Sequence, residues 1–256
     1  MEQGSDRIQF LNCPIDPITM DQVINQCITW CREPRQSQTI VTVNATTLVM
    51  MQTDSKLYEA CTNADLVVAD GVPVVWASRL LGTPLPERVA GVDLLDRLLA
   101  ESSKHQLRVY FLGAKRDVLA KLVTLCREKY PGVLVVGYQD GYFSEAEYPA
   151  VIEKIQNSHT DFLFIGMPTP FKEVWSYQYK NKFNVPVILG VGGSFDVLAG
   201  FIRRAPQWMQ KIGMEWFWRV MMEPRKLFKR HLVVNTLFIG SVWREWWGKN
   251  VNGLHK

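Results

Sequence analysis

Residues 39–71 read TIVTVNATTLVMMQTDSKLYEACTNADLVVADG, and this stretch decides the fold. It begins with an apolar, β-branched run at 39–43, ends with another at 66–69, and holds a helix-length segment at 46–61 between them. Short, almost continuously apolar strands joined by a helix are typical of a parallel sheet that is buried on both faces. The stretch therefore predicts a strand–helix–strand unit of an α/β domain.

The same alternation continues along the chain on both sides of this unit. Further strands are expected at 109–112, 133–136, 162–165 and 185–189. Further helices are expected at 20–31, 92–104, 117–129, 145–155 and 172–179. We predict a Rossmann-like α/β domain over residues 1–200, with a mostly parallel sheet and helices on both of its faces.

Residues 201–256 differ from the rest of the chain in charge and in aromatic content. They carry eleven Lys and Arg against three Glu, whereas residues 1–200 carry eighteen Lys and Arg against twenty-two Asp and Glu. They also hold six of the nine tryptophans, which are Trp208, Trp216, Trp218, Trp243, Trp246 and Trp247. Cationic side chains attract phosphates, and indole rings settle where apolar material meets water. The segment is typical of a membrane-associating helical appendage, although a basic subdomain with inward-facing tryptophans would have the same composition.

A helical projection of this segment separates apolar from basic side chains. The apolar side chains Trp216, Phe217, Val220, Met221, Leu227 and Phe228 share one face. The basic side chains Arg219, Arg225, Lys226, Lys229 and Arg230 share the other. Pro224 is expected to divide the stretch into two helices, since proline fits a first helical turn but not an interior. The result is a basic amphipathic appendage suited to an anionic membrane surface or to a diphosphate.

The uninterrupted part of the appendage is too short to cross a bilayer. Only twelve residues lie between His231 and Arg244, and Asn235 interrupts them.

A nucleic-acid partner is not expected, because the acidic body offers no extended basic groove. A homo-oligomer is compatible with the sequence, with a neighbour covering the apolar face until a membrane replaces it.

The cysteines and the N-terminus indicate a protein of the reducing cytosol. The five cysteines are an odd number with no repeated spacing, and the N-terminus has no apolar signal-peptide core. The four histidines are isolated and no Asp-x-Asp pair occurs, so no metal site is expected.

Candidate ligand-binding residues follow the predicted strands, because ligands of open parallel sheets bind beyond the carboxyl ends of the strands. Thr42 and Asn44 end one strand, Asp70 and Gly71 follow the next, and Gly166 ends a later one. A carboxylate placed there can accept a proton as a general base. Ordinary turn chemistry explains an Asp-Gly pair equally well.

A glycine run follows the last predicted strand and opens a helix. Its members Gly192, Gly193 and Ser194 present backbone N–H groups that suit an anion, although a tight structural turn accounts for them as well. Arg88 could simply pair with Glu87 or Asp93.

Several blocks, in this order, resemble the WecG/TagA/CpsF family of glycosyltransferases. They are TVN at 42–44, ADG at 69–71, ERVAGVD at 87–93, FLG at 111–113, GVGGSFD at 190–196, AG at 199–200, RAP at 204–206 and GMEWFWR at 213–219. The resemblance covers nearly the whole chain. It implies a cytoplasmic enzyme, peripheral on the inner face of the cell membrane, that needs no metal and no cofactor. Such enzymes transfer a hexose or N-acetylhexosamine from a UDP-sugar, with inversion, to a polyprenyl-diphosphate-linked glycan in bacterial surface polysaccharide synthesis.

The resemblance also implies roles for individual residues. Asp70 matches the family's general base, Thr42 and Asn44 its active-site strand end, and Arg88 a substrate contact. Arg219 matches an arginine that the appendage contributes to the site. Further substrate contacts are expected from Gly71, Asp93, Gly166 and the glycine run, and from Arg225, Lys226 and Lys229, whose register is shifted. The rival reading of the same residues is a non-catalytic membrane-surface adaptor or regulator that senses a nucleotide sugar.

One departure from the family pattern lies after the strand at 162–165. The family often has Gly-x-Pro-Lys-Gln-Glu there, whereas this chain reads GMPTPFKE over 166–173, with Pro170 where the glutamine would stand. This version resembles the exopolysaccharide branch, with its xanthan-type glucosyltransferases, more than the wall teichoic acid branch. We therefore expect sugar or acceptor recognition to differ from that of the teichoic acid enzymes.

Overall fold

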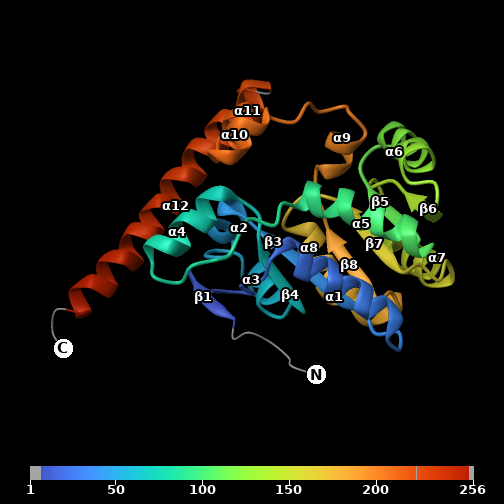
Figure 1. Ribbon diagram of the computed structural model, residues 1–256, viewed down its shortest axis with the longest axis horizontal. Helices are drawn as coiled ribbons and strands as arrows, with labels where there is room; N and C mark the ends of the chain where they lie inside the picture. The colour runs from blue at the N-terminus through green and yellow to red at the C-terminus, as the bar shows by residue number, and fades with distance from the viewer. Residues whose placement is uncertain (1–6, 223, 254–256) are drawn as a thin grey trace.

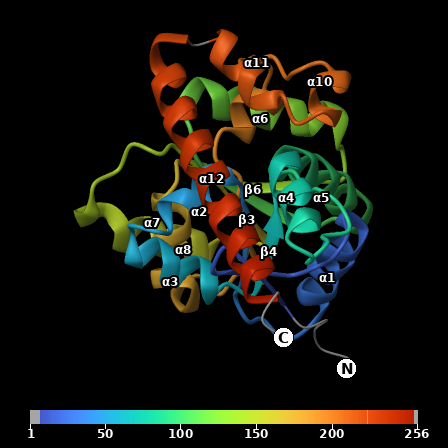
Figure 2. The ribbon, with the colours of Figure 1, turned by 90° about the vertical axis from the view of Figure 1, so that its left-hand side faces the viewer.

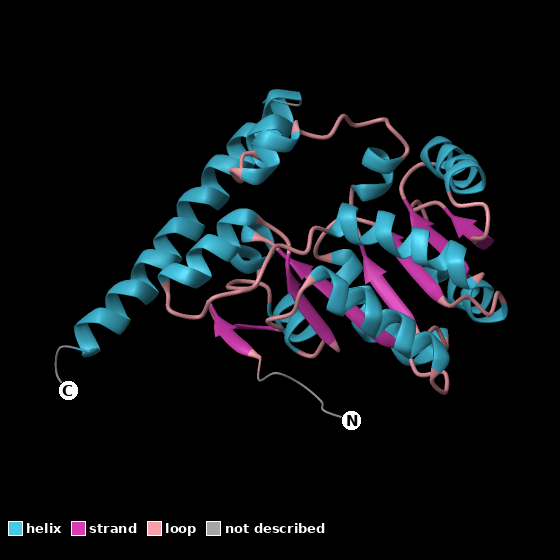
Figure 3. Cartoon of the chain, in the orientation of Figure 1, coloured by secondary structure: helices cyan, strands magenta, loops and turns pink. Residues whose placement is uncertain are grey.

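The structure, a computed structural model, describes residues 7–222 and 224–253. At its centre is a six-stranded sheet of order β4-β3-β8-β7-β5-β6, in which all neighbouring strands are parallel (Figure 3). Its strands are β3 (Gln38–Val43), β4 (Leu66–Ala69), β5 (Arg108–Gly113), β6 (Leu134–Gln139), β7 (Phe162–Gly166) and β8 (Val187–Gly190). Each overlaps a run predicted from the sequence, so the parallel α/β sheet is confirmed.

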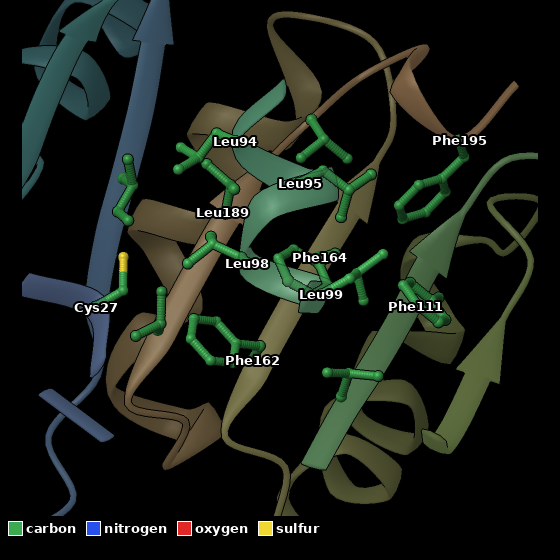
Figure 4. Close-up of a cluster of buried hydrophobic side chains, with 14 of the residues drawn as sticks. Cys27, Leu94, Leu95, Leu98, Leu99, Phe111, Phe162, Phe164, Leu189 and Phe195 are labelled. Carbon is green, nitrogen blue, oxygen red and sulfur yellow. The ribbon is translucent and has the colours of Figure 1, made fainter. Parts of the chain in front are cut away.

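Helices cover both faces of the sheet because successive strand residues point to opposite sides. The helices of the body are α1 (Met20–Arg32), α2 (Ala45–Met50), α3 (Ser55–Thr62), α4 (Val72–Leu80), α5 (Gly91–His105), α6 (Arg116–Lys129), α7 (Tyr148–Asn157), α8 (Phe171–Phe183) and α9 (Ser194–Leu198), with a 3₁₀ turn η1 (Glu145–Glu147) before α7. Phe111, Phe162, Phe164 and Leu189 pack with α1, α5 and α6 on one face (Figure 4). The intervening strand residues pack with α2, α3, α7 and α8 on the other.

The single helix expected over 46–61 is wrong, since the segment forms two helices. The Asp54 side chain accepts a hydrogen bond from the Leu57 N–H at 3.0 Å and caps α3, which ends the continuity with α2. An antiparallel pair, β1 (Ile8–Phe10) and β2 (Cys13–Ile15), and the helix α4 were also not predicted. α4 begins directly after Asp70 and Gly71, so this pair leads into a helix.

The C-terminal segment is helical, as predicted, and consists of α10 (Gln207–Lys211), α11 (Glu215–Met222) and α12 (Pro224–Gly253). Pro224 is the first residue of α12, which confirms the expected division into two helices. The long α12 runs beside α2 and α4 (Figures 1 and 2). Its buried side chains Val234, Phe238 and Val242 join the core under that side of the sheet.

The opposite side of α12 leaves large apolar side chains in solvent. Leu232, Val233, Leu237, Ile239, Trp243 and Trp247 are each at least half exposed. On the face predicted to be apolar, Val220 is buried while Phe217, Met221 and Phe228 are exposed. The side chains of Arg225, Lys226, Leu227 and Arg230 lie outside the described residues. Of the six tail tryptophans, Trp208, Trp243 and Trp247 are exposed and the other three are partly buried, so they do not form an inward-facing cluster.

Within residues 7–222 and 224–253, no helix is long and apolar enough to span a membrane.

The five cysteines are all free thiols, and four of them are buried. Burial raises the pKa of Cys13 and of Cys126 to about 12. Such thiols carry almost no thiolate at neutral pH and pack as small apolar side chains.

Candidate active site

A cleft of about 380 Å³ opens beyond the carboxyl ends of β3, β4 and β8. The body forms one wall of the cleft, and Trp216, Arg219 and His231 of α11 and α12 form the opposite wall. Most of the predicted site residues line it, namely Thr42, Asn44, Asp70, Gly71, Arg88, Gly192, Gly193, Ser194 and Arg219. The structure thus brings residues from five separate parts of the chain together in one cleft.

Three side-chain oxygens meet at the first residue of α5, Gly91. A Cβ placed on Gly91 would lie 3.6 Å from Asp70 Oδ2, 3.7 Å from Thr42 Oγ1 and 3.9 Å from Ser194 Oγ. The Gly91 N–H donates a hydrogen bond of 3.3 Å to Asp70 Oδ2. A carboxylate and two hydroxyls are therefore grouped within the cleft around a residue that has no side chain of its own.

The environment of Asp70 raises the pKa of its carboxyl above the ordinary value. Burial is the largest cause, and it is opposed by the hydrogen bond from the Gly91 N–H and by the positive charge of Arg88. The charge of Glu215 acts in the same direction as burial, and that of Arg219 acts against it. A carboxylate that holds its proton more tightly than usual is a stronger base once it is ionised.

Arg88 belongs to a cluster of ion pairs that joins the body to the appendage. Its guanidinium lies 3.2 Å from Glu215 Oε2, in the first turn of α11, and 3.4 Å from Asp93 Oδ2, in α5. Arg204, in the segment before α10, contacts both oxygens of Asp93, at 2.5 and 2.6 Å. The pairing with Asp93 was one of the sequence alternatives, whereas Glu87 instead accepts a hydrogen bond from the Met20 N–H.

The glycine run forms a tight turn and opens a helix, as expected. Gly192 has φ +54°, in the left-handed region that favours glycine, and Ser194 Oγ donates to the Val191 carbonyl at 2.7 Å. The helix that follows, α9, has only five residues. A Cβ on Gly193 would meet nothing within 4 Å, so this part of the turn is open to the cleft.

Asn44 has a local structural role in addition to its place in the cleft. Its side-chain oxygen accepts hydrogen bonds from the N–H groups of Thr46, at 2.9 Å, and Thr47, at 3.1 Å, and so caps α2. A substrate contact from Asn44 therefore falls to its amide nitrogen.

Among the described residues, three other predicted substrate contacts do not line the cleft, namely Gly166, Asp93 and Lys229. Gly166 lies under the Phe195 ring, where an added Cβ would come within 2.3 Å of a ring carbon. Asp93 binds Arg88 and Arg204 at the cleft edge, and Lys229 is exposed on α12. Arg225 and Lys226 belong to α12, but their side chains lie outside the described residues. Pro170, which takes the place of the family glutamine, directly precedes α8 and does not line the cleft either.

Several residues that line the cleft were not singled out from the sequence. Thr169 and Lys172 lie on the side of β7 and α8, and Trp216, His231 and Asn235 lie on the side of the appendage. Lys172 is notable because it is buried, with only 7% of its surface exposed. The available signal was a lysine at the start of the helix predicted over 172–179, shortly after a predicted strand, but its burial depends on the tertiary fold.

Two comparisons place the chain among known proteins. It matches the glycosyl transferase WecG/TagA/CpsF family over residues 8–252. It is 33% identical over 195 residues to an N-acetylglucosaminyldiphosphoundecaprenol N-acetyl-beta-D-mannosaminyltransferase of Bacillus subtilis (strain 168), covering 76% of this chain and 75% of the relative. It is 30% identical over 222 residues to a protein of the same name from Staphylococcus aureus (strain MW2), covering 86% of this chain and 87% of that relative.

Proposed function

Because the chain belongs to the WecG/TagA/CpsF family of glycosyl transferases, we propose that it transfers a hexose or N-acetylhexosamine from a UDP-sugar to a polyprenyl-diphosphate-linked glycan. The names of the two relatives specify a sugar on undecaprenol diphosphate as acceptor and N-acetylmannosamine as the sugar transferred. The observation that carries the proposal is the grouping of Asp70, Thr42 and Ser194 in a cleft that Arg88 and Arg219 also line. The product would enter bacterial surface polysaccharide synthesis.

In the proposed step, Asp70 accepts the proton of the acceptor hydroxyl while that oxygen attacks the anomeric carbon of the donor sugar. The new oxygen–carbon bond forms on the face opposite UDP, so the anomeric configuration inverts. The bond between the anomeric carbon and the phosphate oxygen breaks, and UDP leaves with the electron pair. The raised pKa of Asp70 suits this role, because a general base works best when its pKa lies nearer the working pH.

Cationic side chains are proposed to stabilise the departing UDP without a metal ion or other cofactor. Arg219 and Arg88 line the cleft, and Arg225 and Lys226 of α12 are further candidates. Fixed cations directed at a developing negative charge lower the barrier because they need not reorganise during the reaction.

The segment 201–256 is proposed to hold the enzyme on the inner face of the cell membrane, where its lipid-linked acceptor would lie. The exposed side chains Leu237, Ile239, Trp243 and Trp247 give α12 an apolar outer surface, and the cations Lys229, Arg244 and Lys249 are exposed on the same helix. Apolar burial together with attraction to anionic lipid is how amphipathic helices bind membranes. A neighbouring copy of the chain would cover the same surface away from the membrane.

The donor sugar can be chosen between two classes by direct competition. Pro170 favours the exopolysaccharide branch and a UDP-hexose, whereas the two relatives transfer an N-acetylhexosamine. UDP-glucose and UDP-N-acetylmannosamine are therefore the first two donors to compare.

The proposal is tested by measuring UDP release in the presence of EDTA from a panel of UDP-hexoses and UDP-N-acetylhexosamines. Short-chain polyprenyl-diphosphate sugars serve as acceptors. We expect acceptor-dependent release by the unmodified chain and a loss of at least about 10²-fold in Asp70→Asn. Asp117→Asn is the matched control, because Asp117 is an exposed carboxylate in the first turn of α6 and does not line the cleft. Binding to liposomes without release from any donor and acceptor pair would favour the adaptor reading instead.

A further inference from the structure

Resting on the proposed function, we propose that Lys172 binds the diphosphate of the nucleotide-sugar donor on the sheet side of the cleft. Lys172 is in the first turn of α8, its side chain is buried, and it lines the cleft together with Thr169, Gly192 and Gly193. Arg88 and Arg219 also line the cleft, but Arg88 pairs with Glu215 of α11 and Arg219 belongs to α11, whereas Lys172 belongs to α8 of the body.

Two glycines at the carboxyl end of β8, Gly190 and Gly192, leave room for the Lys172 side chain. A Cβ on Gly190 would lie 3.0 Å from Lys172 Cδ and 3.2 Å from its Cγ, and a Cβ on Gly192 would lie 3.7 Å from Lys172 Cε. Contacts of 3.0–3.4 Å are tighter than ordinary van der Waals distances, so a side chain at Gly190 would displace the lysine stem. The absence of side chains at these two positions thus leaves room for the lysine stem, and Lys172 and Gly193 line the same cleft.

Lys172 pairs with the buried Glu173, but this pair does not use all the hydrogen-bond donors of the lysine. Lys172 Nζ forms an ion pair with Glu173, whose Oε1 also accepts a hydrogen bond of 2.9 Å from Thr169 Oγ1. An ammonium carries three N–H donors, and among the described residues Glu173 alone accepts one from Lys172. Two donors of a buried cation therefore have no protein acceptor in the described chain, at a point that opens onto the cleft.

A purely structural role explains this pair poorly. Burying two opposite charges in a protein interior is often no better for stability than an apolar pair of the same volume. The pair here is also incompletely satisfied, because Glu173 Oε2 is buried and has no hydrogen-bond partner within the described residues. A cation that is kept in such a place, at a cleft wall, fits an anionic ligand better than it fits packing alone.

The ligand is assigned as a diphosphate from its charge and from the neighbours of Lys172. Phosphate oxygens accept charge-assisted hydrogen bonds from ammonium groups and from backbone N–H groups at glycine turns. The donor and the lipid acceptor both contain a diphosphate, and we assign Lys172 to the donor. It lies beside the glycine run at the carboxyl end of β8, on the wall opposite α11 and α12, which are proposed to face the lipid.

The test measures the affinities of uridine, UMP and UDP by calorimetry for the unmodified chain and two variants. Lys172→Met leaves Glu173 as an unpaired buried charge and is expected to lower the melting temperature. The double variant Lys172→Met/Glu173→Gln removes both charges and keeps an acceptor for Thr169, so its melting temperature should return towards that of the unmodified chain. Lys180→Met is the matched control, since Lys180 lies on the same helix and pairs with Asp65 away from the cleft.

We expect the double variant to bind UDP roughly 10- to 100-fold more weakly, which corresponds to the loss of a charge-assisted hydrogen bond. Its affinity for uridine and its KM for a short-chain polyprenyl-diphosphate acceptor should not change. A folded double variant that binds UDP as tightly as the unmodified chain would overturn the inference, as would an equal loss for uridine and UDP. A rise in acceptor KM without a loss of UDP affinity would move Lys172 to the acceptor and overturn the donor assignment. If the unmodified chain binds no uridine nucleotide, the proposed donor class fails first and the role of Lys172 fails with it.

Discussion

The surroundings of Asp70 have opposing effects on the ionisation of its carboxyl. Burial holds its carboxyl in the protonated form, while the Gly91 N–H and Arg88 favour the ionised form. The side chain nevertheless has to be ionised to act as the proposed base. The cost of that ionisation falls on the folded state, so a group placed for chemistry is expected to reduce stability.

The first prediction concerns the stability of Asp70→Asn. Because the folded-state pKa of Asp70 is raised, the native chain holds this proton more tightly than the unfolded chain does. The tighter proton binding by Asp70 therefore adds to the free energy of unfolding below the ordinary aspartate pKa of about 3.9. This added stability is lost as the pH rises through the folded-state pKa. Asp70→Asn removes this dependence, so the variant should unfold at a higher urea concentration than the unmodified chain at pH 7.5. The difference should shrink towards pH 4, and a difference that is equal at both pH values would contradict the raised pKa.

At the scale of single residues, the strand ends were predictable and the buried partners were not. Thr42, Asp70 and Ser194 follow apolar runs whose carboxyl ends must meet at one edge of a parallel sheet. Lys172 and Glu173 were not identified, because a charged pair in the first turn of a helix normally faces solvent. The role of Asn44 as a helix cap also depends on where α2 begins, which the apolar pattern leaves uncertain by a few residues.

At the scale of elements, the sequence predicted the sheet better than the helices around it. The six strands are apolar runs with little ambiguity, whereas the segment 46–61 has helix-forming residues throughout and only Asp54 to mark its interruption. The pair β1 and β2 was missed because each strand has three residues, too few for a recognisable alternation. Gly166 does not line the cleft because Phe195 of α9 packs against it, a tertiary contact that the strand pattern does not reveal.

The second prediction concerns the cluster of ion pairs that connects α11 with the loop before α5. The charge of Glu215 raises the pKa of Asp70 and the charge of Arg88 lowers it. The acidic limb of the pH profile of kcat/KM should therefore move to lower pH in Glu215→Gln and to higher pH in Arg88→Met. Glu101→Gln is the control, because Glu101 pairs with Lys104 on α5 and should leave the limb in place. Shifts of the same sign in both cleft variants would argue against Asp70 as the titrating base.

At the scale of the whole molecule, the body and the appendage share one site and part of one core. Arg219 and His231 line the cleft from the appendage, and Phe238 and Val242 pack in the core beside the body's own side chains. The change of composition near Gly200 marks where the acidic body gives way to the basic segment. Which side of α12 packs inward could not be predicted, because apolar side chains occur on both sides of that helix.

The third prediction concerns the outer surface of α12. Ile239→Asp together with Trp243→Asp should weaken binding to phosphatidylglycerol vesicles at least roughly 10-fold, since each large apolar side chain contributes about 1.5–3 kcal/mol when it is buried. Both side chains are more than half exposed, so the fold should persist. Activity on a short-chain acceptor in solution should change little, and activity on a membrane-embedded acceptor should fall with binding. Asn250→Asp provides a control for added charge at an exposed position of the same helix. Unchanged vesicle binding in the double variant would remove the outer surface of α12 from the membrane contact.

The strand order has a consequence for how the chain is made. β8 is the last strand to be synthesised, yet it lies between β3 and β7 near the middle of the sheet. When synthesis has reached only α8, the chain can form two separate sheet fragments, β4-β3 and β7-β5-β6. The edges of β3 and β7 then lack the strand that pairs with both of them in the native fold. The arrival of residues 187–190 joins the fragments, and it also delivers the turn that carries Gly192 and Ser194. Translation order thus makes the completion of the sheet a late event that coincides with the completion of the body's wall of the cleft, while the wall from α11 and α12 follows. Before that event, chaperone binding to the open edges is expected.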